Sequence, residues 1–279
     1  MYKINSELAV IGLGVIGLPV AIHVSAQTNN NVIGYDISKE VMERAERNGV
    51  KTSKTFPKAE TYIVAVNTRW GYSDNQPDMS PIEDVCQKIS EINKDALVVL
   101  ESTLAYGTTR RLSLEFGLKY LVACPHRLWP EDIKNHGVNQ IRVIGAVNNT
   151  ALADALALFK QLHIPVVPLP TVEYAEACKV IENTNRFMQI AFAQMTKQLA
   201  DYNGLDFNIL KEAVNSKWNM NVLEARGGIG GTCLPKDIRY LKLMFPDSAL
   251  INGLLQSDEQ YRRHIREAQN KTAPEIQVE

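Results

Sequence analysis

The stretch "LAVIGLGVIGLPVA", residues 8–21, decides the fold of this chain of 279 residues. A short apolar run from Ser6 to Ile11 stops at a glycine and predicts a buried strand. Gly12, Gly14 and Gly17 follow at the spacing G-x-G-x-x-G, and apolar residues then continue at helical spacing from Leu18 to Gln27. A strand, a glycine turn and a helix in this order open a dinucleotide-binding βαβ unit.

The next strand ends in a residue that selects the cofactor. Residues 31–36, "NVIGYD", predict a strand ending in Asp36, at the spacing this motif requires. The glycines let a pyrophosphate approach the backbone, where the helix N-terminus, including Val15 and Ile16, offers N–H donors. The Asp36 carboxylate can accept both ribose hydroxyls and repels a 2′-phosphate, so we expect NAD rather than NADP. Lys39 is the nearby cation that keeps NADP as the alternative.

Strand-like and helix-like segments continue to alternate up to Pro170. Apolar runs occupy residues 61–66, 96–101, 118–124, 141–145 and 164–168. Helix-like stretches occupy residues 38–47, 80–92, 108–116 and 150–162. This alternation predicts an α/β domain over residues 1–170, a Rossmann-like doubly wound parallel sheet covered by helices on both faces.

The pattern after Pro170 is helical. Residues 172–202 contain no proline or glycine and predict one long helix, with apolar side chains at Ala177, Ile181, Met188, Phe192 and Met195. Such a helix suits the interface of a homodimer, although a buried helix spanning two domains explains the same pattern. Further helices at residues 208–216, 236–244 and 248–268 complete an all-helical domain over residues 171–268, followed by a frayed tail, 269–279.

Composition excludes several classes of partner. The net charge is −1, so no global field attracts nucleic acid. The four cysteines, Cys86, Cys124, Cys178 and Cys233, lack paired spacing, which argues against a disulfide framework and a structural zinc site. No apolar window is long enough to span a membrane, and no export signal precedes the first strand. We therefore expect a cytoplasmic protein without a metal and without membrane or nucleic-acid partners.

A second glycine-rich stretch, "GGIGGTCLPKD" at residues 227–237, places Cys233 behind four glycines. A cysteine is a nucleophile as the thiolate, which needs positive charge, N–H donors or a base nearby. Lys236 can supply charge, and Asp237 can orient this lysine or relay a proton. A free cysteine is nevertheless more often a small buried hydrophobe, so the loop alone leaves both interpretations open.

This loop resembles the G-x-G-G-x-C-x-P-K-D loop of the UDP-glucose/GDP-mannose dehydrogenase family. Other segments agree with the family in order and spacing up to about residue 245: "GLGVIGLPVA", "VNTRWGYSDNQPDMSPIE", "ESTLAYGTTR", "CPHRLWPED" with "RVIG", and "EACKVIENTNR". The "CPHRLWP" segment is most similar to the branch that oxidises UDP-N-acetylmannosamine.

The resemblance implies a four-electron oxidation of a sugar primary alcohol to a carboxylate with two NAD. The intermediates would be a thiohemiacetal and a thioester on Cys233. Lys179 and Asn183 match the lysine and asparagine that surround the reacting oxygen in the family, and at i and i+4 they share one helix face. Asp237 and Thr103 match the aspartate and threonine near the hydrolytic water.

The same matches imply further contacts. Cofactor contacts are expected at Gly12, Gly14, Val15, Ile16, Gly17, Asp36, Lys39, Thr68, Thr103 and Lys236. Substrate contacts are expected at Arg127, Lys179, Asn183, Gly230 and Gly231.

Two positions depart from the family pattern. His126 replaces a glutamate that assists thioester hydrolysis. A neutral imidazole can act as a general base, so hydrolysis can survive. The alternatives are release of an aldehyde after one oxidation, or loss of activity. Tyr106 replaces a proline before Gly107 and is expected to change only the stiffness of that turn.

The length of the chain raises a third question, because it ends about forty residues after the cysteine loop. Family members carry a further domain that completes the nucleotide pocket. Either a separate chain supplies this domain, or it has been removed, or the substrate is smaller or held differently, with Arg127, Trp129 and Arg226 contributing.

Two other functions stay open at this level. One is a truncated, non-catalytic paralogue that binds NAD. The other is a different Rossmann dehydrogenase, such as a 3-hydroxyacid enzyme, which shares the lysine and asparagine on a long helix but needs no cysteine.

Overall fold

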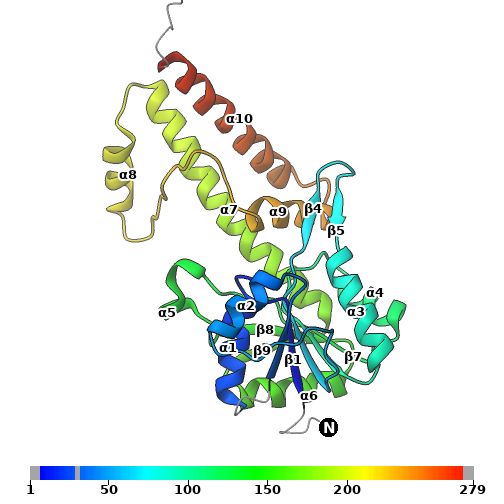
Figure 1. Cartoon of the computed structure of the whole chain (residues 1–279). Helices are drawn as coiled ribbons and strands as arrows, with labels where there is room; N and C mark the ends of the chain where they lie inside the picture. The colour runs from blue at the N-terminus through cyan, green and yellow to red at the C-terminus, as the bar shows by residue number, and fades with distance from the viewer. Residues whose placement is uncertain (1–6, 29–31, 273–279) are drawn as a thin grey trace, which may run out of the picture. The chain divides into compact units, whose positions relative to one another are not determined.

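The computed structural model describes residues 7–28 and 32–272, and the chain divides into two compact units after Lys179. The first unit is α/β and the second is helical (Figure 1). The division falls inside the long helix α7 (Val172–Tyr202).

The first unit is built on a seven-stranded sheet with the order β2-β1-β3-β6-β7-β8-β9. Its strands are β1 (Leu8–Ile11), β2 (Val32–Tyr35), β3 (Thr61–Val64), β6 (Leu97–Leu100), β7 (Tyr120–Ala123), β8 (Arg142–Ala146) and β9 (Val166–Pro168). Neighbouring strands from β2 to β7 pair in parallel, as the alternating pattern predicts.

The parallel prediction needs one correction, because β8 pairs with β7 in the antiparallel direction. The chain between them forms a short 3-10 helix, η1 (Pro130–Asp132), and one turn of helix, α5 (Ile133–His136), which buries no residue. A parallel connection needs a crossover element that packs back on the sheet, and this segment has none.

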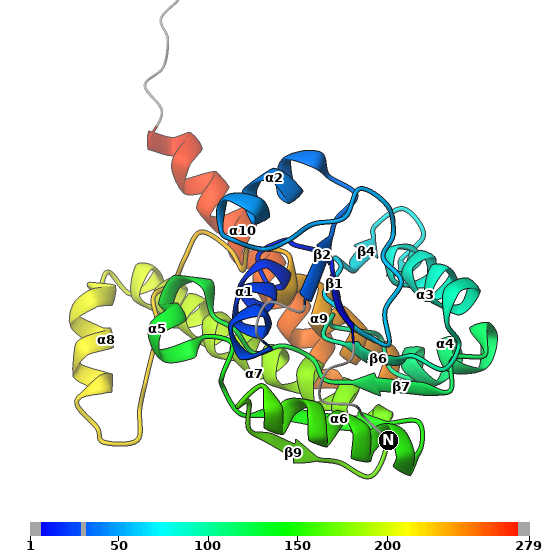
Figure 2. The same cartoon turned by 60° about the horizontal axis from the view of Figure 1, so that its bottom comes forward.

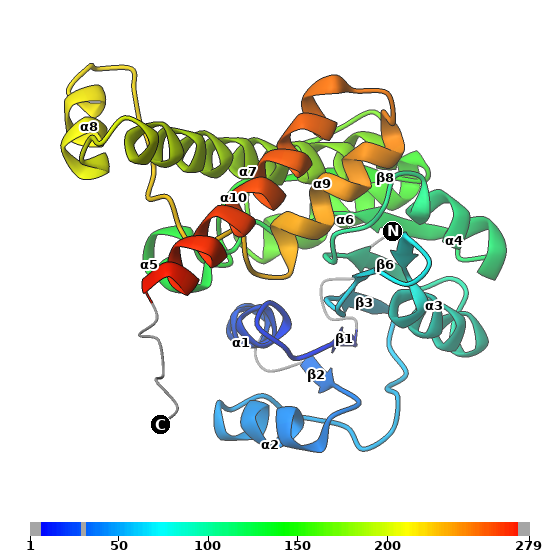
Figure 3. The same cartoon turned by 90° about the horizontal axis from the view of Figure 1, so that it is seen from above.

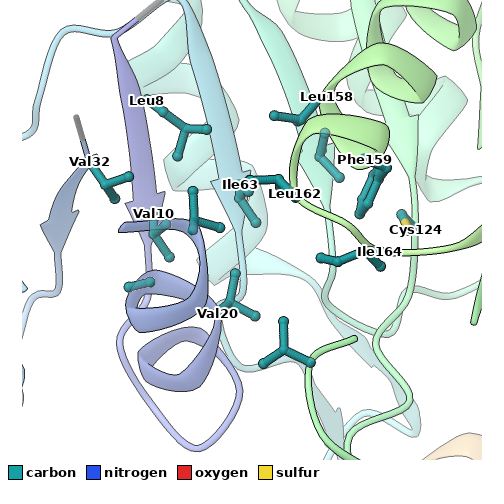
Figure 4. Packing of buried hydrophobic residues seen from close by; sticks show 14 of the residues in the cluster. Leu8, Val10, Val20, Val32, Ile63, Cys124, Leu158, Phe159, Leu162 and Ile164 are labelled. Atoms are coloured by element: carbon teal, nitrogen blue, oxygen red, sulfur yellow. The ribbon is translucent and has the colours of Figure 1, made fainter. Parts of the chain in front are cut away.

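Helices cover both faces of the sheet. They are α1 (Gly17–Gln27), α2 (Lys39–Arg47), α3 (Ser80–Ile92), α4 (Thr108–Phe116) and α6 (Asn149–Gln161). Side chains of α1 and α6, such as Val20 and Leu158, pack in one cluster with Leu8, Val10 and Ile63 of the sheet (Figure 4). Figure 2 shows α3 and α4 on the other side of the strands from α1.

A hairpin that the sequence pattern does not predict follows β3. Its strands, β4 (Arg69–Gly71) and β5 (Gln76–Asp78), pair antiparallel, and Asn75 in the turn has a φ of 57°. Asparagine tolerates this left-handed conformation better than most residues. Three-residue strands are too short to show the alternation by which a strand is recognised.

The glycine turn, Gly12–Gly17, follows β1 and opens α1. Gly12 has a φ of +85°, and a Cβ there would lie 2.7 Å from the carbonyl oxygen of Ala65. A Cβ on Gly17 would lie 1.6 Å from the carbonyl oxygen of Gly12, whereas one on Gly14 would meet no atom within 4 Å. The first and third glycines are therefore required by the protein itself, and the second leaves open space beside the backbone.

The second unit consists of the rest of α7 with α8 (Phe207–Asn215), α9 (Cys233–Met244) and α10 (Ala249–Thr272). Helices α9 and α10 lie side by side (Figure 3). Phe187 and Ile190 of α7 form a core with Ile229, Ile238 of α9 and Ile251 of α10.

Two helix ends in the second unit differ from the sequence pattern. Helix α9 begins at Cys233, three residues before the predicted start at Lys236. Helix α10 continues to Thr272, and residues 273–279 of the predicted tail lie outside the described residues.

Within the described ranges, no helix is both long and apolar enough to cross a membrane. The same residues contain no group of three or more histidine, cysteine, aspartate or glutamate side chains able to hold a metal ion. All four cysteines are free thiols.

The glycine turn gives a test of the fold. We expect Gly17→Ala to lower the free energy of unfolding by about 2 kcal/mol or more, because the added methyl group must displace the Gly12 carbonyl. Gly14→Ala is the matched control, since its methyl group enters open space. Denaturant unfolding of both variants measures the difference, and equal stabilities would show that the turn is not packed in this way.

Candidate active site

The predicted cofactor residues of the first unit lie at one edge of its sheet. The glycine turn follows β1, Asp36 follows β2, Thr68 follows β3 and Thr103 follows β6. These strands are adjacent and parallel, so their carboxyl ends meet at the same edge. Ligands of open α/β sheets bind outside this edge.

Asp36 is bonded to the glycine turn. Its Oδ2 accepts the N–H of Leu13 at 2.8 Å, and its Oδ1 accepts the N–H of Ser38 at 2.9 Å. Each carboxylate oxygen keeps a second lone pair for a ribose hydroxyl. Ser38 caps α2, as its position predicts, by accepting the N–H of Val41 at 3.4 Å.

A cation that the sequence did not single out reaches the same turn. Arg44 of α2 donates from Nη2 to the Leu13 carbonyl at 3.2 Å. Leu13 is therefore held at its N–H by Asp36 and at its C=O by Arg44. The predicted cation, Lys39, instead lies 3.6 Å from Glu43 along α2, with its side chain 88% exposed. Arg44 belongs to a highly charged helix, where one more arginine looks like an ordinary surface residue.

Cross-links join the ends of β3 and β6. Thr68 donates its hydroxyl to the Thr103 carbonyl, and Ser102 donates to the Val66 carbonyl, both at 2.6 Å. Thr68 is buried, so its hydroxyl acts on the backbone of Thr103. These hydrogen bonds fix the spacing between the segments that follow β3 and β6 at the predicted cofactor site.

A buried charge pair lies behind this edge, formed by two residues that no sequence motif singles out. The guanidinium of Arg142 on β8 pairs with Glu101 at the end of β6, and both side chains are almost fully buried. Burial raises the pKa of Glu101, while the charge of Arg142 opposes this rise. An arginine among the apolar residues "IRVIGA" is the signal that could have revealed the pair.

His126 faces this pair. Its Nδ1 accepts the N–H of Leu128 at 2.8 Å, so the proton of the neutral ring sits on Nε2, which lies 3.7 Å from Oε2 of Glu101. Burial, with the charges of Arg142 and Lys179, lowers the pKa of His126 to about 2. Nδ1 is thus occupied, and Nε2 is buried without a hydrogen-bond partner among the described residues, which argues against the predicted role of His126 as a general base.

Glu176 of α7 fixes the turn that precedes α4. Its carboxylate accepts the N–H of Gly107 at 2.6 Å, and the N–H and hydroxyl of Thr109 at 2.7 Å and 2.6 Å. Burial raises the pKa of Glu176, and the Thr109 hydrogen bonds lower it. The turn that precedes α4 is therefore held by a side chain of α7. Lys179 lies three residues after Glu176 and is half-buried.

The predicted residues of the second unit gather on one face of α9. Because α9 begins at Cys233, the side chains of Cys233, Lys236, Asp237 and Tyr240 fall at i, i+3, i+4 and i+7 and share a face. This spacing explains why a lysine and an aspartate follow the cysteine so closely.

Asp237 is fully buried at the centre of this face. Its Oδ1 accepts from Nζ of Lys236, and its Oδ2 accepts from the amide of Asn183 on α7, each at 2.5 Å. Nζ of Lys236 also lies 4.4 Å from the ring centre of Tyr240. Asp237 is thus paired with Lys236, and its role in orienting this lysine stays a prediction. Lys236 does not present a solvent-exposed ammonium for a cofactor, because burial and pairing hold it inside the unit.

Cys233 itself is exposed as the first residue of α9. Helix N–H groups and their partial positive charge stabilise an anion at this position. Gly231 precedes it with a φ of +79°, and a Cβ on Gly230 or Gly231 would meet no atom within 4 Å. The thiol and these glycines therefore offer a surface that a substrate can approach closely.

Three further residues are expected to help hold the substrate, and their surroundings differ from one another. Arg127 donates from Nη1 to the Ile141 carbonyl at 2.9 Å. Trp129 is 46% exposed and lies against the ring of His136. Arg226 is exposed in the second unit. The structure thus assembles two groups of predicted residues, one at the sheet edge of the first unit and one around α9 in the second.

The burial of His126 gives a test by pH. Its pKa is about 2 in the folded chain, against 6.5 for an exposed histidine, so below pH 6.5 the unfolded chain takes up a proton that the folded chain does not. The contribution of His126 to stability is full above pH 6.5 and falls as the pH drops toward 2. Between pH 7 and pH 5 we expect wild type to lose about 2 kcal/mol more unfolding free energy than His126→Asn.

Urea unfolding at the two pH values measures this difference. Asparagine at position 126 keeps an oxygen able to accept the Leu128 N–H. Parallel pH dependences in the two proteins would show that His126 titrates freely in the folded chain.

Each of the two units matches a known domain when the sequence is compared with family profiles. Residues 40–163 match the NAD binding domain of the UDP-glucose/GDP-mannose dehydrogenase family, and residues 173–261 match its central domain. The UDP-N-acetyl-D-mannosamine dehydrogenase of Salmonella typhimurium (strain LT2) is 28% identical over 281 residues, which cover 88% of this chain and 66% of that protein. The protein of the same name from Pyrococcus horikoshii is 30% identical over 264 residues, covering 83% of this chain and 62% of that one.

A solved structure agrees with these relatives. The UDP-D-ManNAc dehydrogenase structure from Pyrococcus horikoshii superposes with a TM-score of 0.80 at 27% identity, covering 91% of this chain and 68% of that one. The chain spans 62% to 66% of the length of the curated relatives described above. The two profile matches, the sheet-edge motif and the cysteine loop lead to one assignment: the chain belongs to the UDP-glucose/GDP-mannose dehydrogenase family.

Proposed function

We propose that this chain takes part in the NAD-dependent oxidation of the primary alcohol of a nucleotide sugar toward the uronic acid. The observation that carries the proposal is Cys233, exposed at the start of α9, the helix that also carries Lys236 and the buried Asp237, which is bonded to Asn183. The relatives named for UDP-N-acetyl-D-mannosamine favour a UDP-N-acetylhexosamine as the substrate.

The residues at the sheet edge fit NAD. The open space beside Gly14 admits a pyrophosphate, and the Asp36 carboxylate stands ready for the ribose hydroxyls. The charge of the Asp36 carboxylate, which is bonded to the glycine turn, disfavours a 2′-phosphate, so NAD is favoured over NADP. When bound, NAD supplies the acceptor for the hydride that leaves the sugar carbon.

Lys179 and Asn183 are proposed to stabilise the oxygen from which the first proton departs. An ammonium and an amide N–H both stabilise negative charge that develops on an alkoxide. Asp237 acts on this chemistry through Asn183, whose amide it holds at 2.5 Å. With both of its oxygens occupied and no exposure to solvent, Asp237 serves as a positioning residue in this state.

Cys233 is proposed to carry the sugar between the two oxidations. Its sulfur adds to the aldehyde carbon, and the carbonyl oxygen takes up a proton, giving a thiohemiacetal. Loss of a hydride from that carbon and of the hydroxyl proton gives a thioester. Attack by water then breaks the carbon–sulfur bond, releasing the carboxylate and restoring the thiol. Thr103, at the end of β6, is the residue proposed to stand near this water.

The surroundings of His126 favour a second candidate function. If the buried imidazole is unable to activate water, a thioester on Cys233 would not be hydrolysed, and turnover would require release of the aldehyde after the first oxidation. That enzyme would transfer two electrons rather than four.

We also propose a homodimer formed through α7. Its exposed apolar side chains recur at intervals of seven residues, which places them along one seam of the helix. They are Ile181, Met188, Phe192, Met195, Leu199 and Tyr202. A second copy of the same seam is the partner that the family relationship favours. We also propose a location in the reducing cytoplasm.

The thiol is tested by Cys233→Ser. Wild type is expected to form two NADH and one uronic acid per nucleotide sugar, and the variant is expected to form no acid, because an alkoxide of serine leaves and adds less readily than a thiolate. NADH absorbance with chromatographic detection of the acid measures both. Cys178→Ser, at a half-buried thiol of α7, is the control.

The stoichiometry separates the alternatives. One NADH per sugar in wild type, with an aldehyde product, supports the two-electron enzyme. NAD binding without NADH production across a panel of UDP- and GDP-sugars supports a non-catalytic paralogue. Full activity in Cys233→Ala would point to a Rossmann dehydrogenase that needs no thiol.

The dimer is tested by placing charge in the seam. Phe192→Glu combined with Met195→Glu is expected to halve the mass measured by sedimentation equilibrium, since two carboxylates would be buried without partners. Gln189→Glu, an exposed position of α7 outside the seam, is the control and should leave the mass unchanged. A monomeric wild-type chain would contradict the proposal.

A further inference from the structure

The segment that leads to Cys233 is held by an ion pair of α10. The N–H of Ile229 donates to Oδ1 of Asp258 at 2.8 Å, and the carbonyl of Ile229 accepts from Nη2 of Arg262 at 2.6 Å. The two α10 side chains bond to each other through Nε of Arg262 and Oδ2 of Asp258, at 2.8 Å. Both polar backbone groups of one loop residue are thus fixed by a single acid–base pair, called here the α10 clamp.

The clamp is itself held in place. Oδ1 of Asp258 also accepts from the amide of Gln194 on α7 at 3.2 Å, and Asp258 is 9% exposed. Tyr261, between the two clamp residues, donates its hydroxyl to the Ala225 carbonyl at 3.1 Å. The chain that precedes Cys233 is therefore anchored to α10 at two residues, Ala225 and Ile229.

The glycine at position 228 is explained by this contact. Gly228 has a φ of +128°, and a Cβ there would lie 2.7 Å from Cζ of Arg262. The guanidinium occupies the space that a side chain would need. Gly230 and Gly231 differ, because a Cβ at either would meet nothing within 4 Å. Gly228 serves the clamp, whereas the two later glycines leave an open surface.

We infer that Asp258 and Arg262 are positioning residues for Cys233, an inference that rests on the proposed function of this thiol. Ile229 stands four residues before Cys233, and its buried side chain packs against the core formed with α9 and α10. The intervening Gly230 and Gly231 have no side chains with which to anchor the chain. The placement of the thiol is therefore set by the clamp on one side and by α9 on the other.

The contact differs from an ordinary surface ion pair. Asp258 and Arg262 stand at i and i+4, a spacing that on an exposed helix contributes little. Here the pair donates to and accepts from a backbone that precedes the nucleophile, and its carboxylate is mostly buried. A charged hydrogen bond to a buried peptide is worth more than the exposed pair would be.

The test compares Arg262→Met with Arg266→Met in the full chain. Arg266 is exposed one turn further along α10, so the control makes the same chemical change away from the loop. In Arg262→Met we expect hydrogen exchange of the amides in residues 228–233 to become roughly tenfold faster or more, because a charged hydrogen bond is lost. Exchange in residues 8–24 of the first unit should be unchanged.

Kinetics supply the second readout. With a nucleotide sugar that the wild type oxidises, kcat is expected to fall on the order of tenfold to a hundredfold in Arg262→Met, because the thiol is less well placed. The KM for NAD should stay within twofold of wild type. Arg262→Lys keeps the charge and is expected to recover part of kcat. It also serves as the working variant if Arg262→Met does not fold.

The outcomes separate the inference from the proposed function. If the wild type forms no NADH, the function fails, and hydrogen exchange alone decides the clamp. Unchanged exchange in residues 228–233 of both Arg262 variants would overturn the inference, as would a loss of kcat that Arg266→Met reproduces. Faster exchange in the loop with unchanged kcat would show that the clamp exists but does not position the thiol.

Discussion

Asp237 has no exposure to solvent, and the arrangement of the second unit depends on how its charge is compensated. A buried carboxylate is stable when its oxygens are hydrogen-bonded and its charge is paired. Lys236 supplies the opposite charge and Asn183 supplies the second hydrogen bond, so a lysine is drawn inward and an amide of α7 is held against α9. Cys233, one turn earlier on the same face, is left at the surface. The buried ion pair and the exposed thiol both follow from the start of α9 at Cys233, since Lys236 and Asp237 then lie one turn inside the helix.

The two glycine-rich turns are held by the same physical device. In the first unit, the N–H and C=O of Leu13 are bonded to Asp36 and Arg44. In the second, the N–H and C=O of Ile229 are bonded to Asp258 and Arg262. A glycine-rich chain has few side chains with which to anchor itself and loses much conformational entropy on folding. In both turns an acid and a base supplied by other elements fix the backbone of an apolar residue that has a glycine on each side.

The departure of His126 from the family pattern acquires a physical meaning beside Glu101 and Arg142. A carboxylate at position 126 would stand near the buried Glu101, and two neighbouring carboxylates repel one another. The neutral imidazole removes that repulsion, with its Nε2 3.7 Å from Oε2 of Glu101. In exchange, the ring gives up the lone pair that a general base needs, because Nδ1 is occupied by the Leu128 N–H. Stability of the sheet edge and water activation are thus in competition at this position.

The amino-acid sequence by itself determined the family, the order of the main helices and of the seven strands of the large sheet, and the residues of both glycine turns. Periodicity and glycine spacing are properties of short stretches of sequence, so they can be recognised before any tertiary contact is known. Only the tertiary structure decided which residues far apart in the sequence come into contact. The direction of β8, the burial of Glu101 with Arg142, and the bonds of Arg44 and Asp258 join residues far apart in the sequence. Their energies come from burial and from pairing across the fold, which no local spacing records.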